Sequence, residues 1–250
     1  MEYPETKKAA NDKIVLNIFD ELISSELSMQ VKKYIAEATG TFALVFCGTG
    51  AIIINQETNG IISHAGIAIT FGLIVMAMIY ALGDVSGAHL NPAVSIAFVL
   101  AKRFEIKNLL PYIISQVAGA ILASIILKIL FPENEYLGST IPTGPFWRSF
   151  VLEVILTFFL MLVIINVATG SKEKGMFAGL AIGSTVLLEA MFAGPITGAS
   201  MNPARSISPA LVSGHTEYLW IYLIATPSGA IMAIYMWKYL SNPPLNNQSK

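Results

Sequence analysis

The chain has 250 residues, of which 54% are hydrophobic and only 12% are charged. A soluble domain carries about 25% charged residues, so this composition excludes an ordinary soluble domain and favours a single membrane domain with short loops. The net charge of −1 gives neither the basic surface of a nucleic-acid-binding protein nor a charged funnel for ionic substrates, and we expect no nucleic-acid partner.

The first part of the chain, residues 1–30, is polar or amphipathic, and we interpret it as a cytoplasmic tail. Apolar side chains recur at helical spacing between residues 14 and 23, which predicts a helix on the membrane surface; a docking or regulatory segment is the alternative. No uninterrupted apolar run preceded by basic residues occurs here, so nothing resembles a cleaved signal peptide.

Six apolar runs are long enough to cross a bilayer. They cover residues 31–55, 61–83, 109–131, 150–169, 176–194 and 218–239. Two further stretches, residues 91–101 and 202–212, are helix-like but too short to span, so we predict that they are re-entrant.

The distribution of basic residues predicts the orientation of these spans. All but three of the 15 Lys and Arg residues lie in inner segments if both termini are cytoplasmic, as the positive-inside rule requires. We therefore expect an integral protein of the plasma (cell inner) membrane, with a short cytoplasmic tail at residues 241–250.

Reactive side chains are few and scattered. The one cysteine, Cys47, lies in an apolar run, which excludes an intrachain disulfide and a multi-cysteine metal site. The histidines His64, His89 and His215 lie far apart, without the spacing of a nucleophile and base or of metal ligands. We expect a protein that is not an enzyme and that binds neither a metal nor a cofactor.

The two halves of the chain repeat the same signals. The pattern of residues 86–93 recurs at residues 197–204, and Gly119 recurs as Gly229. Because each half holds three spans, an odd number, the halves have opposite orientations and form an inverted repeat about an axis in the membrane plane. The predicted fold is an all-α membrane protein with six transmembrane helices and two re-entrant half-helices.

Each half carries the same triplet, which consists of Asn91, Pro92 and Ala93 or of Asn202, Pro203 and Ala204. Asn is a strong N-cap and Pro suits the first helical position, so each triplet begins a short helix. Two such helices meeting tip to tip direct their positive ends, and the free amides of Asn91 and Asn202, at one spot. A cation or hydrated proton is repelled there, whereas a neutral water or alcohol oxygen accepts both hydrogen bonds.

The backbone before each triplet is predicted to line the pore. Non-helical backbone is tolerated at membrane depth only where it lines a cavity or is buried in protein. We expect a ladder of carbonyl acceptors from Gly87, Ala88, His89, Gly198, Ala199 and Ser200.

Two carboxylates, Glu37 and Glu153, lie at matching places inside spans. One interpretation of such residues is a proton path. We favour the other, in which each accepts hydrogen bonds from backbone N–H groups of a re-entrant loop and Gln116 acts similarly.

The segments 86–94 and 198–206 resemble the two signature loops of the major intrinsic protein (aquaporin) family, and the likeness covers residues 31–240. Residues 192–205 are most similar to the nodulin-type intrinsic proteins of plants and their bacterial relatives. The resemblance implies an aquaporin-type channel domain at residues 31–240 and a homotetramer in the lipid bilayer, with one pore per subunit.

The resemblance also implies a four-residue constriction near the outer mouth, formed here by Phe71, Ala190, Ala199 and Arg205. Strictly water-selective members usually have histidine in place of Ala190. Glycerol facilitators usually follow the signature arginine with aspartate, where this chain has Ser206. The chain therefore matches neither subgroup fully.

One position before Ala190, Glu189 stands where nodulin-type proteins tend to have asparagine. One residue is about 100° around a helix. We expect Glu189 to point away from the pore and to bond loop backbone; a role at the pore mouth is the alternative.

The function expected is passive permeation of water and small neutral solutes such as glycerol, with exclusion of protons and ions, because Ala190 and Ala199 leave space. A strictly water-selective pore, or a channel for metalloid acids or ammonia, is the alternative within the family. A coupled secondary transporter is a more distant alternative, since inverted repeats with broken helices also build transporters.

Overall fold

The computed structural model describes the backbone of residues 4–169 and 175–241 and the side chains from residue 27 onward within those ranges. The helices are α1 (Pro4–Glu57), α2 (Ser63–Ser86), α3 (Pro92–Leu100), α4 (Leu109–Leu130), α5 (Phe146–Ala168), α7 (Ala178–Thr197), α8 (Pro203–Ser213) and α9 (Leu219–Ser241), with a short 3-10 turn η1 at Ile106–Asn108. No strand occurs in these ranges, which confirms the predicted all-α fold.

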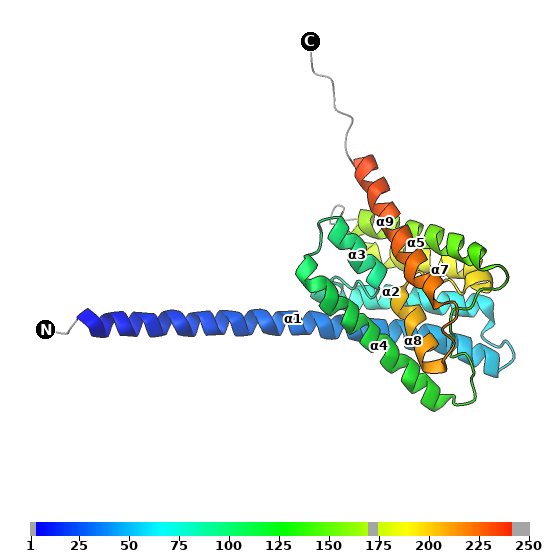
Figure 1. The fold of residues 1–250 in the computed structure, drawn as a ribbon, viewed down its shortest axis with the longest axis horizontal. Helices are drawn as coiled ribbons and strands as arrows, with labels where there is room; N and C mark the ends of the chain where they lie inside the picture. The colour runs from blue at the N-terminus through cyan, green and yellow to red at the C-terminus, as the bar shows by residue number, and fades with distance from the viewer. Residues whose placement is uncertain (1–3, 170–174, 242–250) are drawn as a thin grey trace, which may run out of the picture.

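Six of the described helices are long and apolar enough to cross a membrane. They correspond to the six predicted runs, and α3 and α8 correspond to the two predicted re-entrant segments. The first span is continuous with the chain before it, because α1 is one helix that extends well beyond the bundle (Figure 1). The apolar face predicted for residues 14–23 lies outside the described side chains, as the tail at 242–250 lies outside the described residues.

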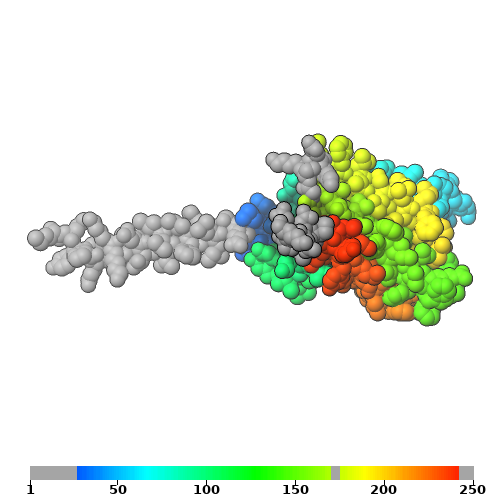
Figure 2. Space-filling view, turned by 90° about the horizontal axis from the view of Figure 1, so that it is seen from above, coloured from blue at the N-terminus to red at the C-terminus, as the bar shows by residue number. Residues whose placement is uncertain are grey.

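Helix packing follows the inverted repeat. In the first half α1 packs against α2 and α4, and in the second half α5 packs against α7 and α9. The halves meet where α2 packs against α7, and each half-helix lies against the last span of the other half, α3 on α9 and α8 on α4. In the space-filling view, the red surface of α9 lies beside a blue-green surface from the first half of the chain (Figure 2).

Glycines allow the close contacts on which this arrangement depends. A Cβ at Gly72 of α2 would lie 2.6 Å from the carbonyl oxygen of Gly183 in α7, and a Cβ at Gly183 would lie 2.6 Å from that of Gly72. Gly119 of α4 meets the backbone of Ala38 in α1 in a comparable way. Because the backbones touch directly, the six long helices are fixed around the two half-helices between them.

Each half-helix begins as its residues predict. Asn91 is the N-cap of α3, and its Oδ1 accepts a hydrogen bond from Ala93 N at 2.9 Å. Asn202 caps α8 through Ala204 N at 3.0 Å. A proline follows each asparagine at the first helical position, where no backbone N–H is needed.

Candidate functional site

The loop between α2 and α3 is held by the carboxylate of Glu37, which is fully buried. Its Oε1 accepts hydrogen bonds from His89 N at 2.9 Å and from Ser86 Oγ at 2.7 Å. Its Oε2 accepts from Leu90 N at 2.7 Å and from Gln116 Nε2 at 2.8 Å. Four donors therefore meet two carboxylate oxygens, and loop backbone that lipid leaves unpaired is satisfied within the protein.

The loop between α7 and α8 is held in the same way by Glu153, which is also fully buried. Its Oε1 accepts from Ser200 N at 2.9 Å and from Thr197 Oγ1 at 2.7 Å, and its Oε2 accepts from Met201 N at 2.9 Å. Thr226, which stands where Gln116 stands in the first half, bonds the carbonyl of Tyr222 instead. Among the described residues, Glu153 thus has three donors where Glu37 has four.

Two tyrosines that the sequence motifs did not indicate belong to these anchors, one in each half. Tyr112 Oη donates to the carbonyl of Ser86 at 2.8 Å, and Tyr222 Oη donates to that of Thr197 at 2.6 Å. Both carbonyls are at the last helical residue before a loop. The signal was present in the sequence, because the tyrosines occupy matching positions of the repeat, but their partners were not predictable from it.

The backbone of the two loops takes left-handed conformations at matching positions. The φ angles are +46° at Ala88 and +52° at Leu90 in the first loop, and +40° at Ala199 and +53° at Met201 in the second. Such a conformation at a non-glycine residue costs about 1–3 kcal/mol and persists only where surrounding contacts enforce it. The two carboxylates supply those contacts.

The two asparagine amides meet at the junction of the halves. Asn91 Nδ2 donates to the carbonyl of Met201 at 2.7 Å, and Asn202 Nδ2 donates to that of Leu90 at 2.8 Å. Each amide thus donates one hydrogen across the pseudo-two-fold axis, a contact that the sequence did not predict. An amide nitrogen carries two hydrogens, so each keeps one donor, and both asparagines line a cavity.

This cavity has a volume of about 510 Å3 and is lined by residues of both halves. Its wall is largely apolar, as in Val75, Leu160 and Ile182. Six residues were predicted to line a pore with their backbone. The cavity reaches five of them, Gly87, Ala88, His89, Ala199 and Ser200, but not Gly198. Pro92, Ala93, Pro203 and Ala204 lie behind it, where they begin the half-helices.

The four residues predicted to form a constriction, Phe71, Ala190, Ala199 and Arg205, all line this cavity. Arg205 is only 1% exposed, and its Cζ lies 5.3 Å from the centre of the Phe71 ring. Its Nη1 donates to the carbonyl of Gly138 at 2.8 Å. Among the described residues, Nε and Nη2 have no hydrogen-bond partner.

Gly138 belongs to the loop between α4 and α5, residues 131–145, which the sequence did not indicate as part of the site. Asn134 Oδ1 accepts from Leu137 N at 2.9 Å, and Asn134 Nδ2 donates to Gln56 Oε1 of α1 at 3.0 Å. The Leu137 side chain is fully buried, and φ is +50° there and +71° at Gly138. The carbonyl that holds Arg205 is therefore fixed through a buried leucine and a bonded asparagine.

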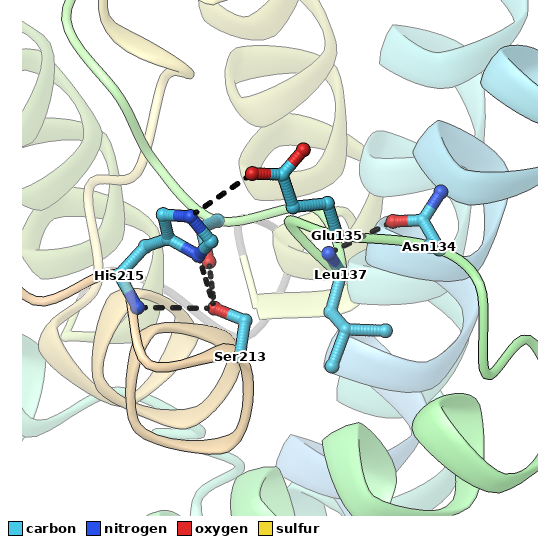
Figure 3. Close-up of polar contacts among 6 residues, drawn as sticks. Asn134, Glu135, Leu137, Ser213 and His215 are labelled. Atoms are coloured by element: carbon cyan, nitrogen blue, oxygen red, sulfur yellow. Dashed lines mark hydrogen bonds and ion pairs between the residues drawn. The ribbon is translucent and has the colours of Figure 1, made fainter.

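The same loop is also tied to the end of α8. Figure 3 shows the His215 ring between Glu135 and Ser213, with Nε2 of His215 lying 3.6 Å from Glu135 Oε1. His215 also lies against the ring of Tyr136, with 4.5 Å between the ring centres. The loop is thus attached to both halves of the molecule.

Glu189 is buried, with 9% exposure, and is not among the residues that line the cavity. Neither carboxylate oxygen has a hydrogen-bond partner among the described residues. The expectation that Glu189 bonds loop backbone is therefore wrong; in this loop the N–H groups of Ser200 and Met201 donate to Glu153 instead.

Comparison with known proteins shows which family shares this architecture. The model of the family described as "Major intrinsic protein" matches residues 24–237. The chain is 46% identical over 223 residues to "Aquaporin NIP1-1" of Zea mays, covering 88% of this chain and 79% of that protein. It is 44% identical to "Nodulin-26" of Glycine max, covering 88% of this chain and 82% of that protein.

Among solved structures, the aquaglyceroporin from Plasmodium falciparum is similar, with a TM-score of 0.73 and 28% identity, covering 83% of this chain and 95% of that one. The resemblance drawn from the two loops and from residues 192–205 is confirmed by these matches, and the matched relatives are channels, not enzymes. A chain with paired Asn-capped half-helices, six apolar spans and these relatives belongs to the major intrinsic protein family, the family of the aquaporin channels.

Proposed function

We propose that this channel passes water and small neutral solutes such as glycerol down their gradients and excludes protons and ions. The observation that carries the proposal is the cavity of about 510 Å3, whose largely apolar wall includes three residues with N–H groups that have no described protein partner. The donors are one N–H of each asparagine amide, Asn91 and Asn202, together with Nε and Nη2 of Arg205.

Ion exclusion follows from the positive ends of α3 and α8 and from the charge of Arg205. Each half-helix directs the positive end of its dipole at the asparagines, where a cation is repelled. A neutral oxygen accepts hydrogen bonds from both amides and is thereby oriented away from its neighbours, which interrupts proton transfer along a chain of waters. The carbonyls of Gly87, Ala88, His89, Ala199 and Ser200, all residues that line the cavity, serve as acceptors along the path.

Selectivity by size is assigned to Phe71, Ala190, Ala199 and Arg205. The methyl groups of Ala190 and Ala199 leave space beside the Phe71 ring, so a carbon chain can lie along the ring while its hydroxyl oxygens accept hydrogen bonds from Arg205. Water alone needs less room. This amphipathic lining favours polyols over a water-only pore.

The functional form is proposed to be a homotetramer in the plasma membrane with both termini cytoplasmic. The positive-inside distribution supports the orientation. Large apolar side chains on outward faces, such as Ile69, Leu188 and Phe192, support contact with lipid or with neighbouring subunits. Chemical cross-linking of detergent-solubilised protein that stops at dimers would contradict the tetramer.

Stopped-flow measurements on proteoliposomes test the function directly. We expect the wild-type protein to raise permeability to water and to glycerol without a proton leak. Ala190→His should fill the space beside Phe71, lowering glycerol permeability sharply while water permeability is retained. Wild-type vesicles that pass water but not glycerol would favour the strictly water-selective pore, and saturable flux driven by a proton or sodium gradient would indicate a transporter.

A further inference from the structure

Gly48 of α1 lies directly behind the ring of Phe71. A Cβ built at position 48 would lie 2.5 Å from Cδ1 and from Cζ of that ring, and closer still to Cε1. Contacts under 3.0 Å are essentially never made by a real Cβ, so a residue with a side chain at this position would displace the ring. The ring therefore occupies space that exists only because residue 48 is glycine.

The helices on either side have little freedom to move apart and restore that space. On α2, Gly72 follows Phe71 and is in backbone contact with α7, where its Cβ would lie 2.6 Å from the carbonyl oxygen of Gly183. On α1, Ala38 is in contact with Gly119 of α4, whose Cβ would lie 2.9 Å from Ala38 Cα. Both helices thus pack closely against a further helix, and the atoms nearest the added Cβ belong to a side chain, so an added methyl group is accommodated by the Phe71 side chain.

The open side of the ring is the cavity. Phe71 is buried yet lines the cavity together with Ala190 and Arg205, and the guanidinium lies 5.3 Å from the ring centre. A ring pushed away from α1 therefore moves toward the passage between these residues. The displacement narrows the passage without changing any residue that faces it.

We propose that Gly48 is a specificity-determining residue, which sets the width of the constriction by letting the Phe71 ring withdraw against α1. The inference rests on the proposed function, because it requires that Phe71 borders the permeation path. Helix α1 contributes none of the four constriction residues. Under this proposal it nevertheless controls the size of the largest solute that passes. Glycerol-sized polyols need the withdrawn ring, whereas water does not.

Gly48→Ala tests the inference, with Gly50→Ala as its matched control on the same helix. A Cβ at position 50 would make only an ordinary contact, at 3.5 Å from Leu127 Cδ2. We expect Gly48→Ala to lower glycerol permeability by about tenfold, the scale at which a fitted pocket discriminates one methylene group, and to lower water permeability much less. Gly50→Ala should behave as wild type. Equal permeabilities for glycerol in assembled Gly48→Ala and Gly50→Ala would overturn the proposal.

A second variant decides whether the effect runs through the ring. Phe71→Leu removes Cε1 and Cζ, two of the three ring atoms nearest to a Cβ at position 48, and leaves only Cδ methyl groups that can rotate away from it. The Gly48→Ala/Phe71→Leu double variant should therefore regain the glycerol permeability that Gly48→Ala loses. A loss that is not regained would show that residue 48 acts by another route. If Gly48→Ala alone fails to assemble, the double variant is compared with Phe71→Leu. A glycerol permeability well below that of Phe71→Leu contradicts the proposal, because residue 48 then acts without the ring.

Failure of the proposed function gives a different result. If wild-type vesicles pass no glycerol, the same three variants are compared by their water permeability. Gly48→Ala should then be slower than Gly50→Ala and should be restored by Phe71→Leu, which supports control of Phe71 by Gly48 in a water-selective pore. Water permeability unchanged by Gly48→Ala would reject the inference.

Discussion

At the scale of single residues, the site combines a few buried donors with small side chains. Arg205 uses one nitrogen to bond Gly138 and leaves two others without a described protein partner. Leaving a buried donor unpaired costs about 1–3 kcal/mol, so these groups favour any solute whose oxygen accepts from them. Under the proposed function, the guanidinium is both a positive barrier and a binding surface for neutral oxygens.

Replacing Arg205 by valine should widen the passage and remove the barrier. We expect Arg205→Val vesicles to pass glycerol and urea faster and to show a proton or cation leak, measured with a pH-sensitive dye trapped inside. Arg148→Val serves as the control, because Arg148 is an exposed residue near the start of α5 and is not among the residues that line the cavity. Unchanged selectivity in a folded Arg205→Val protein would remove Arg205 from the constriction.

At the scale of elements, the loop between α4 and α5 sets the position of the Arg205 guanidinium. Its residue Gly138 supplies the carbonyl that Arg205 bonds, and a Cβ there would lie 2.8 Å from Thr49 Cβ. Asn134 closes the turn before it and connects the turn to the end of α1. The position of Arg205 is therefore tied to a loop that contributes none of the four residues proposed to form the constriction.

Asn134→Ala should loosen this turn. Leu137 N loses its acceptor and Gln56 loses its donor, so Gly138 is held less firmly and Arg205 with it. We expect a weaker form of the Arg205→Val behaviour, with glycerol and urea permeability raised and the free energy of unfolding lowered by about 1–3 kcal/mol. Glu133→Ala, an exposed neighbour, should change neither quantity. Wild-type solute ratios in Asn134→Ala would show that the turn does not position Arg205.

At the scale of the whole molecule, the two halves use the same device with one difference. Each re-entrant loop is bonded by a buried glutamate from the first span of its own half, and each half-helix packs against the last span of the other half. Gln116 adds a fourth donor in the first half, and Thr226 adds none in the second. The two halves therefore resemble each other more closely in their backbone arrangement than in the hydrogen bonds that hold their loops.

This difference predicts how paired substitutions compare. Glutamine at position 37 or 153 keeps one acceptor oxygen but turns an NH2 group toward donors, whereas alanine removes both acceptors. We expect the order wild type, Gln, Ala for tetramer yield and water permeability at both positions, with Glu37→Gln losing more than Glu153→Gln because one more donor loses its partner. If the Gln and Ala variants assembled equally well and lost flux equally, a proton path would explain the carboxylates better than loop anchoring.

The sequence by itself determined the spans, the inverted repeat and the helix-starting triplets, because each depends on local chemistry. Apolar length decides which runs cross a bilayer, and an Asn-Pro pair favours the start of a helix because Asn caps it and Pro has a suitable φ. An odd number of spans per half fixes the opposite orientation of the halves. The tertiary structure confirms these features in α3, α8 and the six long helices.

Only the tertiary structure decided which groups meet across the chain. The amides of Asn91 and Asn202 were expected to donate hydrogen bonds, but the sequence did not show that each gives one hydrogen to the opposite loop. Glu189 was expected to bond loop backbone, yet neither of its oxygens has a partner among the described residues. The carbonyl of Gly138 and the space behind Phe71 at Gly48 depend on the distance between segments far apart in sequence. A sequence pattern gives each residue's periodicity and hydrogen-bonding capacity, but the partner that satisfies a buried group is set by how closely the helices pack.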